Sequence, residues 1–122
     1  MGRMAFSGKV FEHMRERYRM IRDWRFWAER VKEVVRKYLP DARVYVFGSV
    51  VEGKAIASSD IDVLIVSGKA PQSLKEKTEL QLRIEDELGL EFPKPNPFEF
   101  HIVTPKEAEW YFKYLKIKYV EV

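Results

Sequence analysis

The chain has 122 residues, of which 46% are hydrophobic and 34% are charged, and it contains no cysteine. This composition is typical of one folded domain, and the lack of cysteine excludes disulfides, thiolate metal sites and a cysteine nucleophile. No apolar run approaches the roughly 20 residues that span a bilayer. We therefore expect a cytoplasmic protein with no membrane partner.

The first 40 residues form a basic segment with helical periodicity. They hold eleven Lys and Arg against five Asp and Glu, whereas the net charge of the whole chain is +3. Apolar residues recur in steps of three and four, which predicts the buried stripe of one helix or of two consecutive helices. The stripe consists of Phe11, Met14, Tyr18, Ile21, Trp24, Ala28, Val31, Val35 and Tyr38. Asp23 is a candidate cap for a second helix, and Pro40 is expected to end it.

The basic surplus of this segment has two interpretations. It indicates either a solvated helix face or a surface that attracts nucleotide or nucleic acid.

Residues 41–122 alternate between short strands and helices. The predicted elements are strands at 44–47 and 61–66, a helix at 73–88, a strand at 98–103, a helix at 105–115 and a strand at 117–122. Capping residues mark the helix starts, because Ser73 precedes Glu76 by three residues and Thr104 precedes Glu107 by three. This order predicts an α+β fold, with a twisted mixed sheet and helices packed on one side. We expect a single domain over 1–122, with a helical segment at 1–40 and an α+β core at 41–122.

A glycine turn followed by two carboxylates is the most informative motif of the chain. Gly48 and Ser49 end the first predicted strand, and Asp60 and Asp62 open the second. Residues at i and i+2 of a strand point to one face, so the two carboxylates can converge on one hard cation. Backbone amides of the glycine turn can face an anion. A simple strand-start turn would leave Asp62 as a costly carboxylate within an apolar strand.

The same segment departs from a Walker A loop. Its glycine and lysine spacing is similar, but Ala55 stands where that loop needs a Ser or Thr hydroxyl for magnesium. The segment also leads into a strand instead of opening a helix, so this alternative is disfavoured.

The pattern Gly48-Ser49-x3-Gly53-x5-Ser59-Asp60-x-Asp62 resembles the core motif of the minimal nucleotidyltransferases, which belong to the DNA polymerase beta-like superfamily. The resemblance implies the palm-like fold of that superfamily. It implies transfer of an NMP unit from ATP or another NTP to a hydroxyl of a protein or nucleic acid, with release of pyrophosphate. The cofactor would be Mg2+, with Mn2+ as an alternative.

The resemblance also assigns roles to residues of this sequence. Asp60 and Asp62 would hold the metal. The nucleotide would be bound by residues of the turn and its loop, which are Gly48, Ser49, Gly53, Lys54 and Ser59.

The family places a third carboxylate inside a later strand, where this chain offers two candidates. Glu99 and His101 lie on one face of the strand at 98–103, and the usual aspartate is absent from both positions. We favour Glu99 as catalytic residue and metal ligand, because a carboxylate is a hard ligand and can act as a base. His101 is the auxiliary candidate, as a proton acceptor or as a structural histidine.

Partners follow from the same resemblance. The chain leaves little room for an acceptor-binding domain, so a homodimer or a partner protein would complete the site. Minimal nucleotidyltransferases are commonly paired with a HEPN-domain ribonuclease toxin. One alternative function is therefore that of an antitoxin, which acts on such a toxin by modification or by binding. A non-catalytic nucleotide-binding regulatory module is the other alternative, because the third ligand departs from the pattern.

Overall fold

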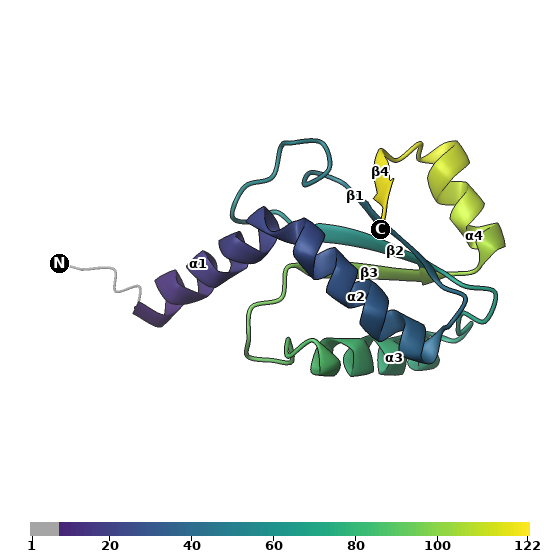
Figure 1. Cartoon of the computed structure of the whole chain (residues 1–122), viewed down its shortest axis with the longest axis horizontal. Coiled ribbons are helices and arrows are strands. Elements are labelled where there is room, and N and C mark those ends of the chain that lie inside the picture. Colours follow the sequence, from purple (N-terminus) through teal and green to yellow (C-terminus); the bar gives the residue numbers. More distant parts are fainter. Residues whose placement is uncertain (1–7) are drawn as a thin grey trace.

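A four-stranded mixed sheet lies at the centre of the structure, a computed structural model that describes residues 8–122 (Figure 1). Its strands, in the spatial order β3-β2-β1-β4, are β1 (Arg43–Phe47), β2 (Ile61–Val66), β3 (Phe98–Val103) and β4 (Tyr119–Glu121). β1 is antiparallel to β2 and to β4, whereas β2 and β3 are parallel. Parallel neighbours need a long crossover connection, and helix α3 (Leu74–Glu87) lies in the connection between β2 and β3.

Helices cover the two faces of the sheet unequally. The long helices α2 (Trp24–Tyr38) and α3 pack on one face. The short helix α4 (Pro105–Glu109) and the π-helical turn η1 (Trp110–Tyr114) pack on one end of the other face. The α+β class is confirmed, and the C-terminal segment adds a partial second layer to the predicted arrangement. None of the helices within residues 8–122 is long and apolar enough to cross a membrane.

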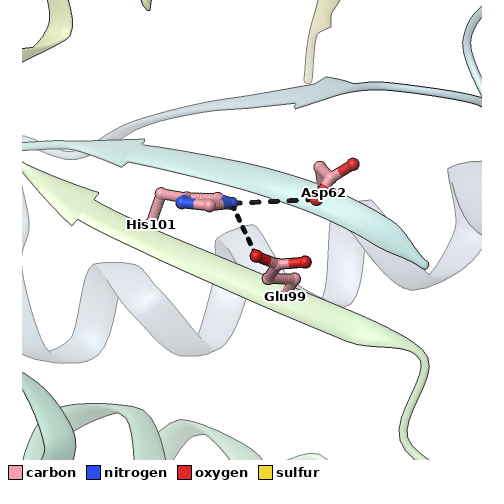
Figure 2. A group of neighbouring side chains, drawn as sticks. All are labelled: Asp62, Glu99 and His101. Atoms are coloured by element: carbon pink, nitrogen blue, oxygen red, sulfur yellow. Dashed lines mark ion pairs between the residues drawn. The ribbon is translucent and has the colours of Figure 1, made fainter.

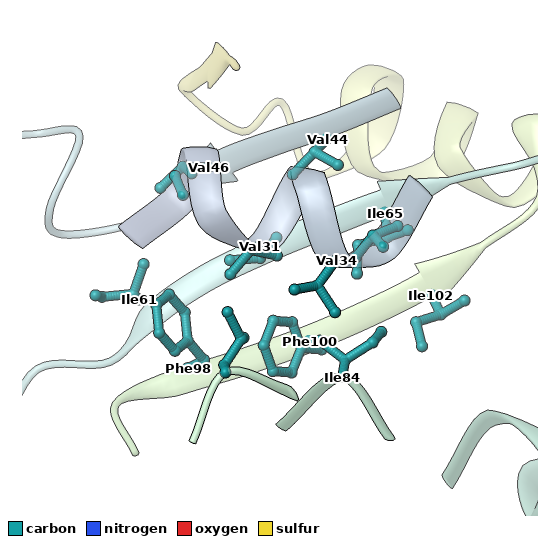
Figure 3. Packing of buried hydrophobic residues seen from close by; sticks show 14 of the residues in the cluster. Val31, Val34, Val44, Val46, Ile61, Ile65, Ile84, Phe98, Phe100 and Ile102 are labelled. Atoms are coloured by element: carbon teal, nitrogen blue, oxygen red, sulfur yellow. The ribbon is translucent and has the colours of Figure 1, made fainter. Parts of the chain in front are cut away.

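The main core lies between the sheet and the helices α2 and α3 (Figure 3). Strand side chains alternate between faces, so every second residue of β1, β2 and β3 points into this core. These buried residues are Val44, Val46, Ile61, Val63, Ile65, Phe98, Phe100 and Ile102. Val31 of α2 and Ile84 of α3 are fully buried against them. Burial of each such side chain contributes about 1.5–3 kcal/mol, so this layer holds the strands in place.

The opposite face of the sheet has a smaller apolar cluster, which is most deeply buried toward one end. Leu64 and Val103 are buried there beneath Ala108 of α4. α4 starts at a capping box, in which the Thr104 hydroxyl accepts from the Glu107 amide and the Glu107 carboxylate accepts from the Thr104 amide. The other end of this face carries polar side chains, which form the site described below.

The N-terminal segment consists of two consecutive helices, α1 (Gly8–Arg22) and α2. Asp23 stands at the N-cap position of α2, but its carboxylate accepts hydrogen bonds from the Arg22 guanidinium instead of a helix amide. α2 ends at Tyr38, two residues before Pro40, as predicted.

The predicted burial of the apolar stripe is right for α2 and wrong for the first part of α1. Phe11, Met14 and Tyr18 are between 47% and 53% exposed. α1 extends beyond the sheet (Figure 1) and reaches the core only near its C-terminal end, through Met20 and Ile21. An apolar stripe predicts the face of a helix, but it does not predict how far the sheet extends beneath that face.

Candidate active site

Three polar side chains lie together at the uncovered end of the sheet face (Figure 2). Asp62 comes from β2, and Glu99 and His101 come from the neighbouring strand β3. The parallel register places Asp62 beside Glu99, and His101, two residues further along β3, projects from the same face. One ligand atom from each side chain lies within 4.8 Å of the others, the only such group found within residues 8–122.

The His101 Nε2 atom faces both carboxylates. It lies 3.7 Å from Asp62 Oδ1 and 3.7 Å from Glu99 Oε1. This nitrogen is buried and has no hydrogen-bond partner among the described residues. A buried polar atom without a partner is costly, and a divalent cation between the three side chains would provide one. Two carboxylates and one imidazole therefore form a donor set that fits a divalent cation.

Tyr111 supports the imidazole from its other side. Its hydroxyl lies 3.4 Å from His101 Nδ1, and the Phe47 ring packs 5.5 Å from the imidazole centre. Burial raises the pKa of Tyr111, and the charges of Glu107 and Glu99 add to this effect, so the hydroxyl keeps its proton at neutral pH. If Nδ1–H donates to this hydroxyl, the Nε2 lone pair faces the carboxylates, as it does in a metal-ligating histidine.

The glycine turn lies directly against the carboxylate of Asp62. Gly48 has φ of +88°, a left-handed conformation that favours glycine. A Cβ atom at this position would overlap the Asp62 carboxylate. The Gly48 carbonyl accepts hydrogen bonds from the amides of Val51 and Glu52, which closes a tight turn and leaves the Ser49 amide outside these bonds. The turn and the carboxylate cluster are therefore parts of one site.

Asp60 has a different partner from Asp62. Its Oδ1 atom lies 2.8 Å from Nη2 of Arg17 in α1, and its side chain is 55% exposed. β2 begins at Ile61, so Asp60 immediately precedes the strand. It does not belong to the group of three ligand-bearing side chains. The metal role assigned to Asp60 by the sequence stays a prediction.

The other predicted nucleotide-binding residues lie in the loop between β1 and β2. Gly53 has φ of +73°, which only glycine adopts readily. Lys54 is 77% exposed, with its Nζ 3.9 Å from the Glu52 carboxylate. The Ser59 hydroxyl oxygen accepts a hydrogen bond from the Ile56 amide at 2.8 Å, so it shapes the loop. Contacts of these residues with a nucleotide stay predictions.

Sequence reasoning missed two residues that contact the site, Arg17 and Tyr111. Arg17 lies 43 positions before Asp60, and no local pattern connects residues that far apart. The sequence does contain a signal that could have identified Tyr111. The caps at Thr104 fix the start of α4, and Tyr111 follows the buried Ala108 by three residues, so both face the sheet.

A cavity of about 580 Å3 opens beside the histidine. Residues of β3 line it together with Lys77 of α3 and with Trp110 and Tyr111 of η1. This volume is typical of a small-molecule site. Because His101 borders both the cavity and the carboxylate cluster, a group held in the cavity lies close to the cluster.

A protein-family model described as a nucleotidyltransferase domain matches residues 28–120. The crystal structure at 1.40 Å resolution of a nucleotidyltransferase candidate from Sulfolobus solfataricus is similar, with a TM-score of 0.54 and 21% identity over 98% of this chain and 90% of that one. This likeness shows a shared fold. Together with the α+β architecture, the two matches confirm the fold class predicted from the sequence.

A curated protein also matches part of the chain. The "Probable RuBisCO transcriptional regulator" of Phaeodactylum tricornutum is 29% identical over 77 residues, which are 63% of this chain and 25% of that protein. The chain therefore spans about a quarter of the length of this curated relative.

Proposed function

The chain belongs to the nucleotidyltransferase domain family, and we propose that it transfers an NMP unit from ATP or another NTP to a hydroxyl group. The acceptor is a hydroxyl of a protein or a nucleic acid, and pyrophosphate is the second product. A divalent cation, Mg2+ or Mn2+, is the cofactor of this proposal.

The observation that carries the proposal is the convergence of Asp62, Glu99 and His101 beside the Gly48 turn. Two carboxylates and a buried imidazole nitrogen, which has no hydrogen-bond partner within residues 8–122, give a cation three donors within one small volume. In this proposal Glu99 takes the third ligand position, and His101 would be a further ligand of the same cation. Asp60 would become a ligand once its carboxylate no longer contacts Arg17.

The site supports the chemistry of nucleotidyl transfer. A divalent cation held here supplies the positive charge that the α-phosphate and the leaving pyrophosphate require. The acceptor oxygen forms a bond to the α-phosphorus, and the bond from that phosphorus to the bridging β-phosphate oxygen breaks. Glu99 Oε1 faces His101 and the side chain is 55% exposed, so its second oxygen is available to accept the hydroxyl proton.

The glycine turn would hold the β- and γ-phosphates. Backbone amides in such a turn bind anions without adding a charged side chain, and the Ser49 amide is outside the bonds that close the turn. The Ser49 hydroxyl would add a second donor, and the exposed Lys54 amine would add positive charge from the same loop. The cavity beside His101 would receive the acceptor.

A non-catalytic nucleotide-binding module is the second candidate function. Two observations favour it: Asp60 is bound by Arg17, and a histidine stands in the metal-binding group. Such a module, or an antitoxin that acts by binding its toxin, would bind ATP with a divalent cation and transfer nothing.

Transfer of label from ATP tests the proposal. ATP labelled at the α-phosphate is incubated with Mn2+ or Mg2+, the protein, and a cell extract that supplies protein and RNA acceptors. We expect label from α-labelled ATP to enter one acceptor class only when the protein is present, and label from γ-labelled ATP to enter the extract equally with and without the protein. Asp62→Asn should reduce labelling by at least about 100-fold, because it removes a charge required in the transition state.

Asp86→Asn is the matched control, since it neutralises an exposed carboxylate on α3 away from the site. It should label the acceptor as the wild type does. Equal labelling by Asp62→Asn, or an increase in transfer from γ-labelled ATP when the protein is added, would contradict the proposal. Metal-dependent ATP binding without any labelling would support the binding module instead.

A further inference from the structure

Arg17 of helix α1 makes two polar contacts with the active-site loop, while Tyr18 and Ile21 of the same helix lie beside Val50 and Ala55 of that loop. The Arg17 Nη2 lies 2.8 Å from Asp60 Oδ1, and its Nη1 donates a hydrogen bond of 2.7 Å to the Ala57 carbonyl. Both acceptors belong to the loop that connects the glycine turn to β2. The Arg17 side chain is only 18% exposed, although most residues of α1 are exposed. The guanidinium is therefore held in place by two partners, as a fork-shaped donor allows.

This contact occupies a carboxylate to which the proposed function gives a metal role. Asp60 precedes Asp62 by two residues, and both are predicted metal ligands. A guanidinium and a divalent cation carry charge of the same sign, so they repel each other when both approach Asp60 Oδ1. A cation that uses Asp60 must displace Arg17 or weaken its contact.

Arg17 is also important for the attachment of α1. The helix reaches the core through Met20 and Ile21 near its C-terminal end, whereas Met14 and Tyr18 are about half exposed. Loss of the Arg17 contact would therefore loosen the part of α1 that precedes Met20. Ligand binding at Asp60 and docking of α1 are linked through one side chain.

We propose that Arg17 is a positioning residue that holds Asp60 until a divalent cation binds, and that cation binding loosens the part of α1 that precedes Met20. This inference rests on the proposed function, because it requires a cation at Asp60. It gives the site a resting state, in which Arg17 replaces the cation as the partner of this carboxylate.

Binding of Mn2+ alone tests the first half of this proposal. The affinity is measured by isothermal titration calorimetry for the wild type, Arg17→Ala, Arg17→Lys and Arg15→Ala. Arg15→Ala is the matched control, because it removes the same charge from an exposed position of the same helix. Arg17→Ala should bind Mn2+ about three- to fivefold more tightly than Arg15→Ala, the range expected for a partly exposed ion pair. Arg17→Lys, which keeps the charge, should bind more weakly than Arg17→Ala.

Hydrogen exchange of the wild type tests the second half of the proposal, so this test does not depend on the folding of a variant. In the wild type, saturating Mn2+ should increase amide exchange in α1 and leave α3 unchanged. In Arg17→Ala, exchange in α1 should already be fast and should not respond to Mn2+.

The outcomes separate this inference from the proposed function. Equal Mn2+ affinity of Arg17→Ala and Arg15→Ala, or α1 exchange that ignores Mn2+ in the wild type, would overturn the role of Arg17. Failure of the wild type to bind Mn2+ at all would overturn the proposed metal site itself.

Discussion

At the scale of single residues, the site depends on the absence of a side chain as much as on its carboxylates. Gly48 combines a φ of +88° with a position at which a Cβ would overlap the Asp62 carboxylate. Conformation and space therefore both require glycine, for independent reasons. Gly89, after α3, has a similar φ of +73°, but a Cβ added to it would meet no atom of another described residue within 4 Å, so only its conformation requires glycine.

This difference predicts a selective effect of Gly48→Ala. Both Gly48→Ala and Gly89→Ala should destabilise the protein by about 1–2 kcal/mol, because alanine is strained in the left-handed region. Only Gly48→Ala should also displace Asp62, and we expect its Mn2+ affinity to fall about tenfold or more. Calorimetric titration with Mn2+ and thermal unfolding of both variants measure the two effects. Unchanged Mn2+ affinity in Gly48→Ala would show that Asp62 is not a ligand.

The sequence predicted the position of some site residues well and of others not at all. Alternation along the single strand β3 was enough to place Glu99 and His101 on the face opposite the core. Their proximity to Asp62 depends on a parallel register between β2 and β3, which strand patterns do not encode. The contact between Arg17 and Asp60 depends on where α1 crosses the loop, and only tertiary structure determines that.

At the scale of elements, α3 anchors the crossover that makes β2 and β3 parallel. Its inner face is apolar, with Ile84 fully buried between the helix and the sheet (Figure 3). Its outer face includes Leu82, which is 59% exposed. Ile84 and Leu82 are therefore two aliphatic side chains of the same helix that lie in opposite environments.

Truncation of these two side chains should therefore have very different effects. Ile84→Ala should lower the free energy of unfolding by about 2–5 kcal/mol, because it leaves a cavity in the main core. Leu82→Ala should change it by less than about 0.5 kcal/mol, as expected for an exposed position. Urea denaturation followed by circular dichroism measures both values. A cost for Leu82→Ala close to that of Ile84→Ala would mean that the outer face of α3 is covered in solution.

The helices show which structural features local sequence signals predict and which they do not. The caps at Ser73 and Thr104 predicted the starts of α3 and α4, and the structure confirms both, because each hydroxyl oxygen accepts a hydrogen bond from a backbone amide of its helix. Caps and periodicity act within one or two turns of helix, so they predict element starts and faces. Burial of α1 depends instead on the extent of the sheet, which explains why the prediction for Phe11, Met14 and Tyr18 was wrong.

At the scale of the whole molecule, exposed carboxylates connect elements that are distant in sequence. Glu87 of α3 accepts hydrogen bonds from Lys37 and Tyr38 of α2. Glu121 of β4 pairs with Arg43 of β1 through two hydrogen bonds of 2.8 Å. The carboxylate of Asp41, before β1, accepts hydrogen bonds from the Ser67 hydroxyl and the Gly68 amide after β2.

These contacts predict that the fold loses stability in acid. Hydrogen bonds from Lys37 and Tyr38 lower the pKa of Glu87, the Ser67 hydroxyl lowers that of Asp41, and the Arg43 guanidinium lowers that of Glu121. A carboxyl whose pKa is lower in the folded state stabilises the fold above its unfolded pKa, and this stabilisation is lost as the pH falls through the folded pKa. The contribution should be complete near pH 7 and should decline below about pH 4.

A double variant separates these groups from the general effect of acid. Asp41→Asn with Glu87→Gln removes two of the carboxyls while keeping their shape, so its Tm should be lower than that of the wild type at pH 7. Between pH 7 and pH 3 its Tm should then fall by less, because two of the groups that take up protons on unfolding are gone. Asp86→Asn, which alters an exposed carboxylate of α3 outside these pairs, should follow the wild-type curve. The Tm of the double variant could instead fall as far as that of the wild type over this range. In that case the acid sensitivity would come from protonation elsewhere in the molecule, and not from the carboxyls of Asp41 and Glu87.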